Sequence, residues 1–122
     1  MAFQIVLQEG LLHVQLSGTL SRADLDHLAS AIEKLEAPAL PVPNRIIDLT
    51  RVTEMAIDFA DVLAIAERRK QQRFPNSFRT ALVAGRPIGK GYARMFQALN
   101  DHPQITIEVF SDRETALRWL AQ

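Results

Sequence analysis

The sequence predicts a single α/β domain over residues 1–122, with its elements in the order ββαβαβαβα. Three observations support this fold class. Apolar and polar residues alternate in the first 17 residues and again in residues 105–109, as in strands with one buried face. Apolar residues recur every three or four positions in four other segments, as in amphipathic helices. At 122 residues, 48% of them hydrophobic, the chain is long enough for one domain with its own core. Because helices separate the later strands, the sheet of about five strands should be mixed but mostly parallel.

A hairpin is predicted at the beginning of the chain. Glu9-Gly10 separates the two alternating runs and suits a tight turn. Alternation implies that one face is buried and the other meets solvent. The side chains expected on the buried face are Phe3, Ile5, Leu7, Leu12, Val14 and Leu16.

The first helix is predicted to begin after Gly18. Ser21 suits its N-cap, and Asp24 follows three residues later. Its expected buried stripe consists of Leu25, Leu28, Ala29, Ile32 and Leu35. Three prolines at positions 38, 41 and 43 then predict an extended connection.

Two short, nearly continuous apolar runs, residues 45–49 and 80–84, are predicted as inner strands. A second helix should lie between them, from near Asp58 to Gln72. Its expected buried stripe consists of Phe59, Val62, Leu63 and Ala66.

The remaining segments predict a helix, a more exposed strand and a final helix. The third helix carries the apolar stripe Tyr92, Met95, Phe96 and Leu99, and the strand carries Ile105, Ile107 and Val109. The last helix opens on Ser111-Asp112-Arg113-Glu114, a sequence typical of a capping box, and is expected to bury Ala116, Leu117 and Leu120. Trp119 is expected to anchor that helix on the sheet.

The composition excludes several kinds of chemistry. There are no cysteines, so disulfides, thiolate nucleophiles and zinc–sulfur sites are ruled out. The first residues lack the basic region and long apolar run of a signal peptide, and no apolar stretch approaches the ~20 residues that span a bilayer. We expect a cytoplasmic protein with no membrane span. No nucleophile or acid/base pair is evident, so neither an enzyme nor a cofactor or metal is predicted.

Three segments resemble the SpoIIAA-like branch of the STAS superfamily. They are the opening hairpin, the strand end Ile47-Asp48-Leu49-Thr50 and the closing segment from Val109 to Leu120 (VFSDRETALRWL). The superfamily includes antagonists of anti-sigma factors and cytoplasmic domains of anion transporters, and by fold the branch is linked to lipid-binding SEC14-like modules. The resemblance implies an α/β domain that acts through protein or small-ligand contacts rather than catalysis.

The sequence departs from the phosphorylatable members of that superfamily at one position. In those antagonists the second helix opens with Asp-Ser-Ser-Gly, whereas the matching segment here reads Ala56-Ile57-Asp58-Phe59. Without a gap, the phosphorylated serine falls on Asp58, so the resemblance implies that the phosphoserine switch is missing. Asp58 is interpreted as a helix cap, and the alternative is a permanently charged stand-in for phosphoserine.

Charge is distributed unevenly, although the net charge is zero. Residues 1–67 hold ten acidic and four basic side chains, whereas residues 68–100 hold eight basic and no acidic ones. Cations at the end of the second helix complement its dipole, and the alternative is one basic face for an anionic partner. The residues predicted for such a face, or for an anion site, are Arg68, Arg69, Arg73, Arg86, Gly89 and Lys90.

Residues 84–91 lie between a predicted strand and a predicted helix, which is the context of an anion-binding loop. A nucleotide-binding signature is excluded, because three residues rather than four separate Gly85 from Gly89 and no hydroxyl follows Lys90. The open alternatives are an anion site and an ordinary turn with solvated charges.

The predicted function is a non-catalytic regulatory or scaffolding module that binds a protein partner or a second copy of itself. The predicted contact residues lie in the loop into the second helix, which is unusually apolar: Met55, Ile57, Asp58 and Phe59. Simple packing under that helix is the other interpretation. The alternative function is a carrier or sensor of a small apolar or anionic ligand, which needs a pocket of ~300 Å³ between the second and third helices. Nucleic acid is disfavoured, because exposed aromatics do not accompany the basic residues.

Overall fold

Five strands form one mixed sheet, and helices cover both of its faces. The structure, a computed structural model, describes residues 2–122. The strands are β1 (Phe3–Gln8), β2 (Leu11–Ser21), β3 (Asn44–Ala56), β4 (Phe78–Val83) and β5 (Ile105–Phe110). The helices are α1 (Arg22–Glu36), α2 (Phe59–Lys70), α3 (Pro87–Leu99) and α4 (Arg113–Leu120). This is the predicted element order.

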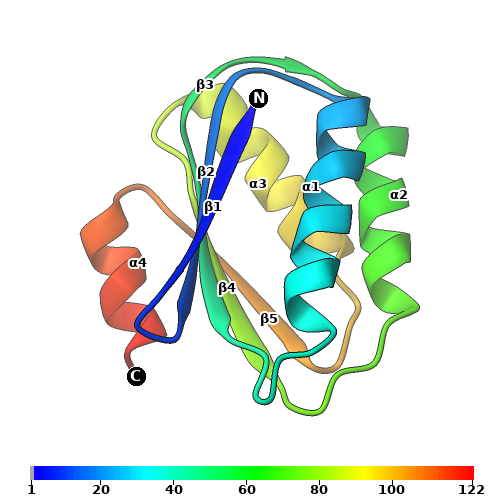
Figure 1. Cartoon of the computed structure of the whole chain (residues 1–122). Helices are drawn as coiled ribbons and strands as arrows, with labels where there is room; N and C mark the ends of the chain where they lie inside the picture. The colour runs from blue at the N-terminus through cyan, green and yellow to red at the C-terminus, as the bar shows by residue number, and fades with distance from the viewer. Residues whose placement is uncertain (1) are drawn as a thin grey trace.

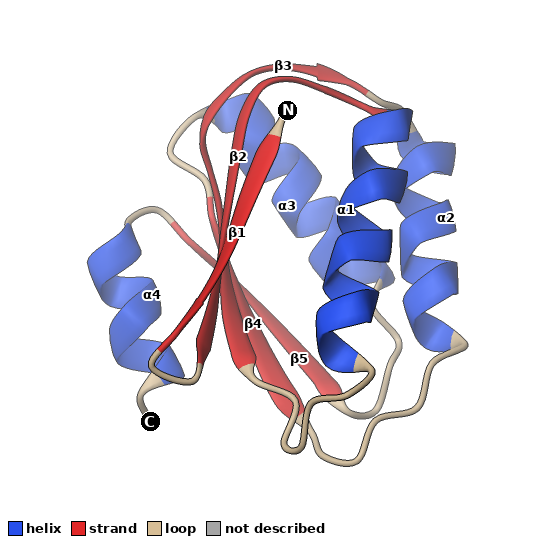
Figure 2. Ribbon diagram, in the orientation of Figure 1, coloured by secondary structure: helices blue, strands red, loops and turns tan. Residues whose placement is uncertain are grey.

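The strands lie in the sheet in the order in which they occur in the chain, β1-β2-β3-β4-β5. β1 pairs antiparallel with β2, and the other three pairings are parallel. Helices α1, α2 and α3 cover one face, and α4 lies alone on the other (Figures 1 and 2). The carboxyl ends of the four parallel strands therefore lie at one edge of the sheet, where α1, α2 and α3 begin.

The predicted hairpin is confirmed, but its buried face is shorter than expected. Glu9 and Gly10 both have positive φ values, 53° and 75°, as a tight two-residue hairpin turn requires. Phe3 and Leu16 are paired and buried, whereas Leu7 is exposed. Leu7 lies next to the turn on the edge strand β1, and the turn between β1 and β2 lies away from α1 (Figure 1).

Strands β2 and β3 are longer than predicted. Their pairing runs from Leu11 opposite Asn44 to Ser21 opposite Ala56, with register shifts before Ser17 and Thr19. Residues 54–56, predicted as part of a loop, therefore belong to β3. The polar residues Thr50, Arg51, Thr53 and Glu54 in the second half of β3 are exposed, while Val52 among them is buried.

The helix boundaries show which sequence signals set them. Ser21 caps α1 in a capping box with Asp24, as predicted. The prediction for α4 was wrong by one residue: the N-cap is Asp112, whose side chain accepts a 2.8 Å hydrogen bond from the Thr115 amide. The box expected from Ser111 to Glu114 does not form, because an Asp at the cap satisfies the free amides equally well.

The two faces of the sheet have separate cores. On the α4 face, Ile46, Ala81 and Ala116 are completely buried, and small residues let α4 approach the sheet closely. On the other face, apolar side chains of β2 pack under α1 and those of β4 and β5 pack under α3. Trp119 packs against Phe110 with ring centroids 5.5 Å apart, in keeping with its expected role as an anchor for α4.

None of the helices in residues 2–122 is long and apolar enough to cross a membrane.

Candidate functional site

The carboxyl edge of the sheet brings two predicted sites together. β3 and β4 are neighbours and parallel, so both run toward the same edge, although β3 continues eight residues beyond Asp48, its last partner in β4. The Tyr92 hydroxyl of α3 donates a 2.7 Å hydrogen bond to the carbonyl of Ile57, just before α2. The predicted contact loop and the predicted anion loop thus lie at the same edge.

Large apolar side chains are exposed at this edge. Phe59, the first residue of α2, is 55% exposed, and Ile88, near the start of α3, is 50% exposed. Ile88 lies one helical turn before Tyr92 and so on the same side of α3. The prediction that Phe59 belongs to the buried stripe of its helix was wrong, because Phe59 is the first residue of α2 and its side chain is exposed at the sheet edge. We call Ile57, Asp58, Phe59 and Ile88 the apolar edge surface.

Met55 and Ile57 lie differently from Phe59. Both are half-buried and line a cavity beneath the helices, and Met55 lies in β3 and packs against the core under α1. Both residues therefore pack inward, Met55 under α1 and Ile57 at the cavity. Asp58 and Phe59, in contrast, are exposed to solvent.

Asp58 is the N-cap of α2. Its side chain accepts a 2.9 Å hydrogen bond from the Asp61 amide, and the Asp61 carboxylate accepts one of 3.0 Å from the Asp58 amide. This is a reciprocal capping box. The capping interpretation is therefore confirmed. A role as a substitute for phosphoserine stays a prediction.

Replacing Asp58 tests how much of its role is the cap. Asp58→Ala is expected to lower the free energy of unfolding by about 1 kcal/mol, because the Asp61 amide loses its acceptor. Asp58→Ser should keep most of the stability, since serine is also a good N-cap. Urea unfolding followed by circular dichroism measures both. Equal losses in the two variants would show that the carboxylate does more than cap.

The start of α3 provides the other predicted residues at this edge. Arg86 is the N-cap by position but makes no side-chain capping bond, and Pro87 follows it in the first turn. Gly89 is buried beside Ala84, whose Cβ would lie 3.5 Å from a Cβ at position 89. Arg86 is exposed and Lys90 is half-buried. Anion binding by these residues stays a prediction.

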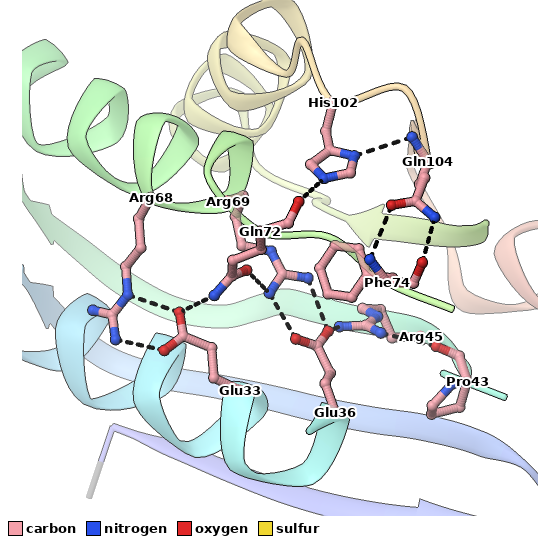
Figure 3. Close-up of polar contacts among 10 residues, drawn as sticks. All are labelled: Glu33, Glu36, Pro43, Arg45, Arg68, Arg69, Gln72, Phe74, His102 and Gln104. Carbon is pink, nitrogen blue, oxygen red and sulfur yellow. Dashed lines mark hydrogen bonds and ion pairs between the residues drawn. The ribbon is translucent and has the colours of Figure 1, made fainter. Parts of the chain in front are cut away.

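The predicted basic residues do not form one face. Arg68, Arg69 and Arg73 lie at the end of α2, before the amino end of β4, whereas Arg86 and Lys90 follow its carboxyl end. Two of the arginines at the end of α2 form ion pairs within the protein. Arg68 donates two 2.7 Å hydrogen bonds to Glu33, and Arg69 donates bonds of 2.7 and 2.8 Å to Glu36 (Figure 3).

A buried charge cluster, Glu36, Arg45 and Arg69, was not predicted from the sequence. Glu36 is 5% exposed and Arg45 is 2% exposed. Both arginines donate to the Glu36 carboxylate, and Arg45 also donates a 2.9 Å hydrogen bond to the carbonyl of Pro43 (Figure 3). The Arg45 guanidinium lies 4.1 Å from the centroid of the Phe78 ring. The one signal in the sequence was an arginine at the front of an otherwise apolar inner strand.

Burial and ion pairing shift the pKa values of the groups in and beside the cluster. Burial lowers the pKa of Arg45 to about 10, against the opposing effect of Glu36. Burial by itself would raise the pKa of Glu36, but the hydrogen bonds and charges of Arg69 and Arg45 outweigh it and lower that pKa. Hydrogen bonds from Arg68 lower the pKa of Glu33 in the same way.

Acid is therefore expected to destabilise the fold. A carboxyl whose pKa is lowered on folding stabilises the protein above its unfolded-state pKa, near 4.5 for glutamate, and this contribution is lost as the pH falls. Capping carboxylates of Asp24, Asp61 and Asp112 have lowered pKa values and act in the same direction. Urea midpoints at pH 7, 5, 4 and 3 should fall mainly below pH 4.5. A midpoint that stays constant down to pH 3 would contradict this assignment.

A cavity of about 150 Å³ lies between the sheet and helices α1, α2 and α3. Its lining is mostly apolar, and includes Leu20, Leu28, Leu82, Ala93 and Phe96. Its polar lining comes from Arg45, Arg69, Thr80, Tyr92 and Asn100. A pocket of ~300 Å³ between the second and third helices was predicted. The observed space is half that volume and extends under α1 as well.

A second, polar hollow of about 370 Å³ lies beside β1, β2, β3 and the start of α4. His13 Nδ1 accepts a 2.7 Å hydrogen bond from Arg113, since a guanidinium can only donate. Burial and the charge of Arg113 lower the pKa of His13. The buried Asp48 accepts hydrogen bonds from the amide and hydroxyl of Thr50, at 2.8 and 2.6 Å.

Solved structures share this fold. One is an uncharacterized protein of the DUF3478 family with a SpoIIAA-like fold from Shewanella loihica PV-4, at a TM-score of 0.64 and 20% identity, covering 98% of this chain and 92% of that one. Another is an anti-sigma factor antagonist from Mycobacterium paratuberculosis, at a TM-score of 0.64 and 17% identity, covering 98% and 93%. No protein-family model matches the sequence, and a search of curated proteins finds no significant relative.

The chain has the SpoIIAA-like fold. The predicted fold is thereby confirmed, from the opening hairpin to α4.

Proposed function

We propose that this protein is a non-catalytic regulatory module that binds a protein partner through the apolar edge surface. The observation that carries the proposal is Phe59, a large aromatic side chain 55% exposed at the start of a capped helix. Exposed apolar side chains grouped on a surface mark contacts with other molecules, and aromatic residues dominate the energy of such contacts. The solved anti-sigma factor antagonist of the same fold supports a regulatory role by analogy.

The proposal includes the absence of a phosphoserine switch. Asp58 carries no hydroxyl, and its carboxylate is engaged with the first turn of α2. A permanent negative charge there gives a surface that does not change state by phosphorylation at this position. A partner surface with an exposed apolar pocket and a basic rim would complement Phe59 and Asp58 together.

The experiment compares three forms of the protein as bait. Wild type and variants Phe59→Asp and Leu40→Asp are used to capture proteins from the source organism's extract, and bound proteins are identified by mass spectrometry. Leu40 is 82% exposed and lies at the opposite end of the molecule, so it is the matched control. Wild type and the Leu40 variant should retain the same partner, while Phe59→Asp should lower its affinity at least about tenfold.

Measured affinities and melting temperatures complete the test. The three baits should melt within a few degrees of one another, because both substituted positions are exposed. Capture of one partner equally by wild type and Phe59→Asp would overturn the apolar edge surface as its binding site. A partner that proves to be a second copy of the chain would appear as a dimer in sedimentation experiments that Phe59→Asp disrupts.

A second candidate function, a carrier or sensor of a small ligand, is favoured by the apolar cavity. Its volume of about 150 Å³ limits the occupant to a molecule of about the size of benzene. The cavity and the apolar edge surface share the segment that holds Ile57, so the two functions are compatible in one protein.

A further inference from the structure

Arg45 has a polar atom that nothing in the protein satisfies. Its side chain lines the cavity and is 3% exposed. One terminal nitrogen donates to Glu36 and the other to the carbonyl of Pro43. Nε is buried and forms no hydrogen bond with any of residues 2–122. An unpaired buried donor of a charged group is costly, so the position calls for an acceptor that the chain does not supply.

The charge cluster around Arg45 is also unbalanced. It contains two guanidinium groups, of Arg45 and Arg69, and one carboxylate, of Glu36. Including the neighbouring pair of Glu33 and Arg68 does not change the balance, because it adds one carboxylate and one guanidinium. One positive charge therefore remains uncompensated at the wall of an apolar cavity, where an unpaired charge is strongly disfavoured.

The rest of the cavity is suited to an apolar body. Thr80 and Asn100 accompany the two arginines, while most of the remaining lining is aliphatic or aromatic. The occupant that satisfies both parts has one negative, hydrogen-bond-accepting group and a small apolar body. A neutral apolar molecule would leave Nε and the positive charge unmatched. A phosphate ester carries about two charges at neutral pH, more than the single excess here.

We propose that the cavity binds a small amphiphilic carboxylate, with its carboxylate at Arg45 and its apolar body between the sheet and helices α1 to α3. This inference rests on the second candidate function and narrows it to a ligand class. Aromatic monocarboxylates and short aliphatic acids have this chemistry, and a cavity of about 150 Å³ takes a ring of about the size of benzene.

The test compares two probes of nearly equal shape. Benzoate is charged at pH 7, and benzamide is neutral. Each is titrated into wild-type protein, with binding followed by calorimetry and by amide NMR shifts. Benzoate should bind at least about tenfold more tightly than benzamide. The largest shifts should occur at the amides of the cavity residues Arg45, Thr80 and Leu82.

Three variants show whether the probes bind in the cavity and whether Arg45 causes the preference for benzoate. Arg45→Met should bring the affinity for benzoate down to that for benzamide while leaving benzamide binding in place. Arg79→Met is the matched control, because it removes a guanidinium that packs on Trp119 on the other face of the sheet, and should keep the preference for benzoate. Ala93→Leu places a larger side chain into the cavity wall and should abolish binding of both probes.

The outcomes separate this inference from the candidate function on which it rests. Equal affinity of wild type for both probes would overturn the charge selectivity and leave the apolar carrier standing. No binding of either probe at about 10 mM would overturn both. Binding that survives Ala93→Leu would place the ligand elsewhere and also overturn the proposal. The wild-type comparison decides the matter even when Arg45→Met does not fold.

Discussion

Glu36→Ala is expected to lower the free energy of unfolding by about 3–5 kcal/mol, because it leaves two guanidinium groups in the interior without a counter-charge. Glu36 is 5% exposed and accepts hydrogen bonds from Arg45 and Arg69. These bonds connect the end of α1 to the start of β3 and the end of α2. Urea denaturation at pH 7, followed by far-UV circular dichroism, gives the change.

Two further substitutions serve as controls for Glu36→Ala. Arg45→Met should cost no more than about 1 kcal/mol, because Arg69 still neutralises Glu36 and an apolar side chain suits the site. Glu33→Ala should also cost about 1 kcal/mol or less, since its pair with Arg68 is partly exposed. A loss in Arg45→Met as large as that in Glu36→Ala would show that the cluster does not carry an excess of positive charge.

Leu82→Ala is expected to destabilise the protein by about 2–5 kcal/mol, the range for truncating a buried leucine. Leu82 is 4% exposed, lies in the inner strand β4 and lines the cavity, so the space it leaves adds to a void that already exists. The neighbouring strands cannot collapse into that space, because hydrogen bonds hold them on both sides. The loss should therefore fall in the upper part of the range.

The same denaturation experiment measures Leu82→Ala, with Leu40→Ala as its control. Leu40 is exposed in a loop, and truncating it should change the free energy of unfolding by less than about 0.5 kcal/mol. An equally small loss in Leu82→Ala would mean that the cavity wall adjusts freely around the missing side chain.

Hydrophobic periodicity was enough to predict the order of the elements. Alternation identified β1, β2 and β5, and helical spacing identified all four helices, because each element buries one face against a single neighbouring layer. Boundaries were predicted less well where burial changed along an element. β3 extends through residues 50–56 because it pairs with β2, although its sequence there is largely polar. A single sequence does not reveal that partner strand.

The charge cluster was missed because the buried face of α1 shifts by one residue near the end of the helix. Both Leu35 and Glu36 are possible continuations after Ile32, at i+3 and i+4, and the apolar residue was the natural choice. In the structure Leu35 is exposed and Glu36 is buried. The charge becomes tolerable only because Arg45 and Arg69, from distant parts of the chain, converge on it.

The sequence predicted that the apolar segment before α2 belongs to the candidate site. It did not predict which of its residues are buried and which are exposed. Met55 and Ile57 face inward and Phe59 faces solvent, which depends on where β3 ends relative to the sheet edge. The pocket was expected, but its smaller volume and its arginine wall depend on side chains that meet only in the folded protein.

Helices α1 and α2 are joined by ion pairs at both of their ends. Arg22 lies 3.2 Å from Asp61 where the helices begin, and Glu33 and Glu36 pair with Arg68 and Arg69 where they end. Within residues 2–122, no ion pair involves a residue of α3. Ion pairs therefore connect α1 to α2, whereas α3 is connected to the segment before α2 by the uncharged hydrogen bond from Tyr92 to Ile57. High salt should weaken the contacts between α1 and α2 more than this bond, because salt screens interactions between charges.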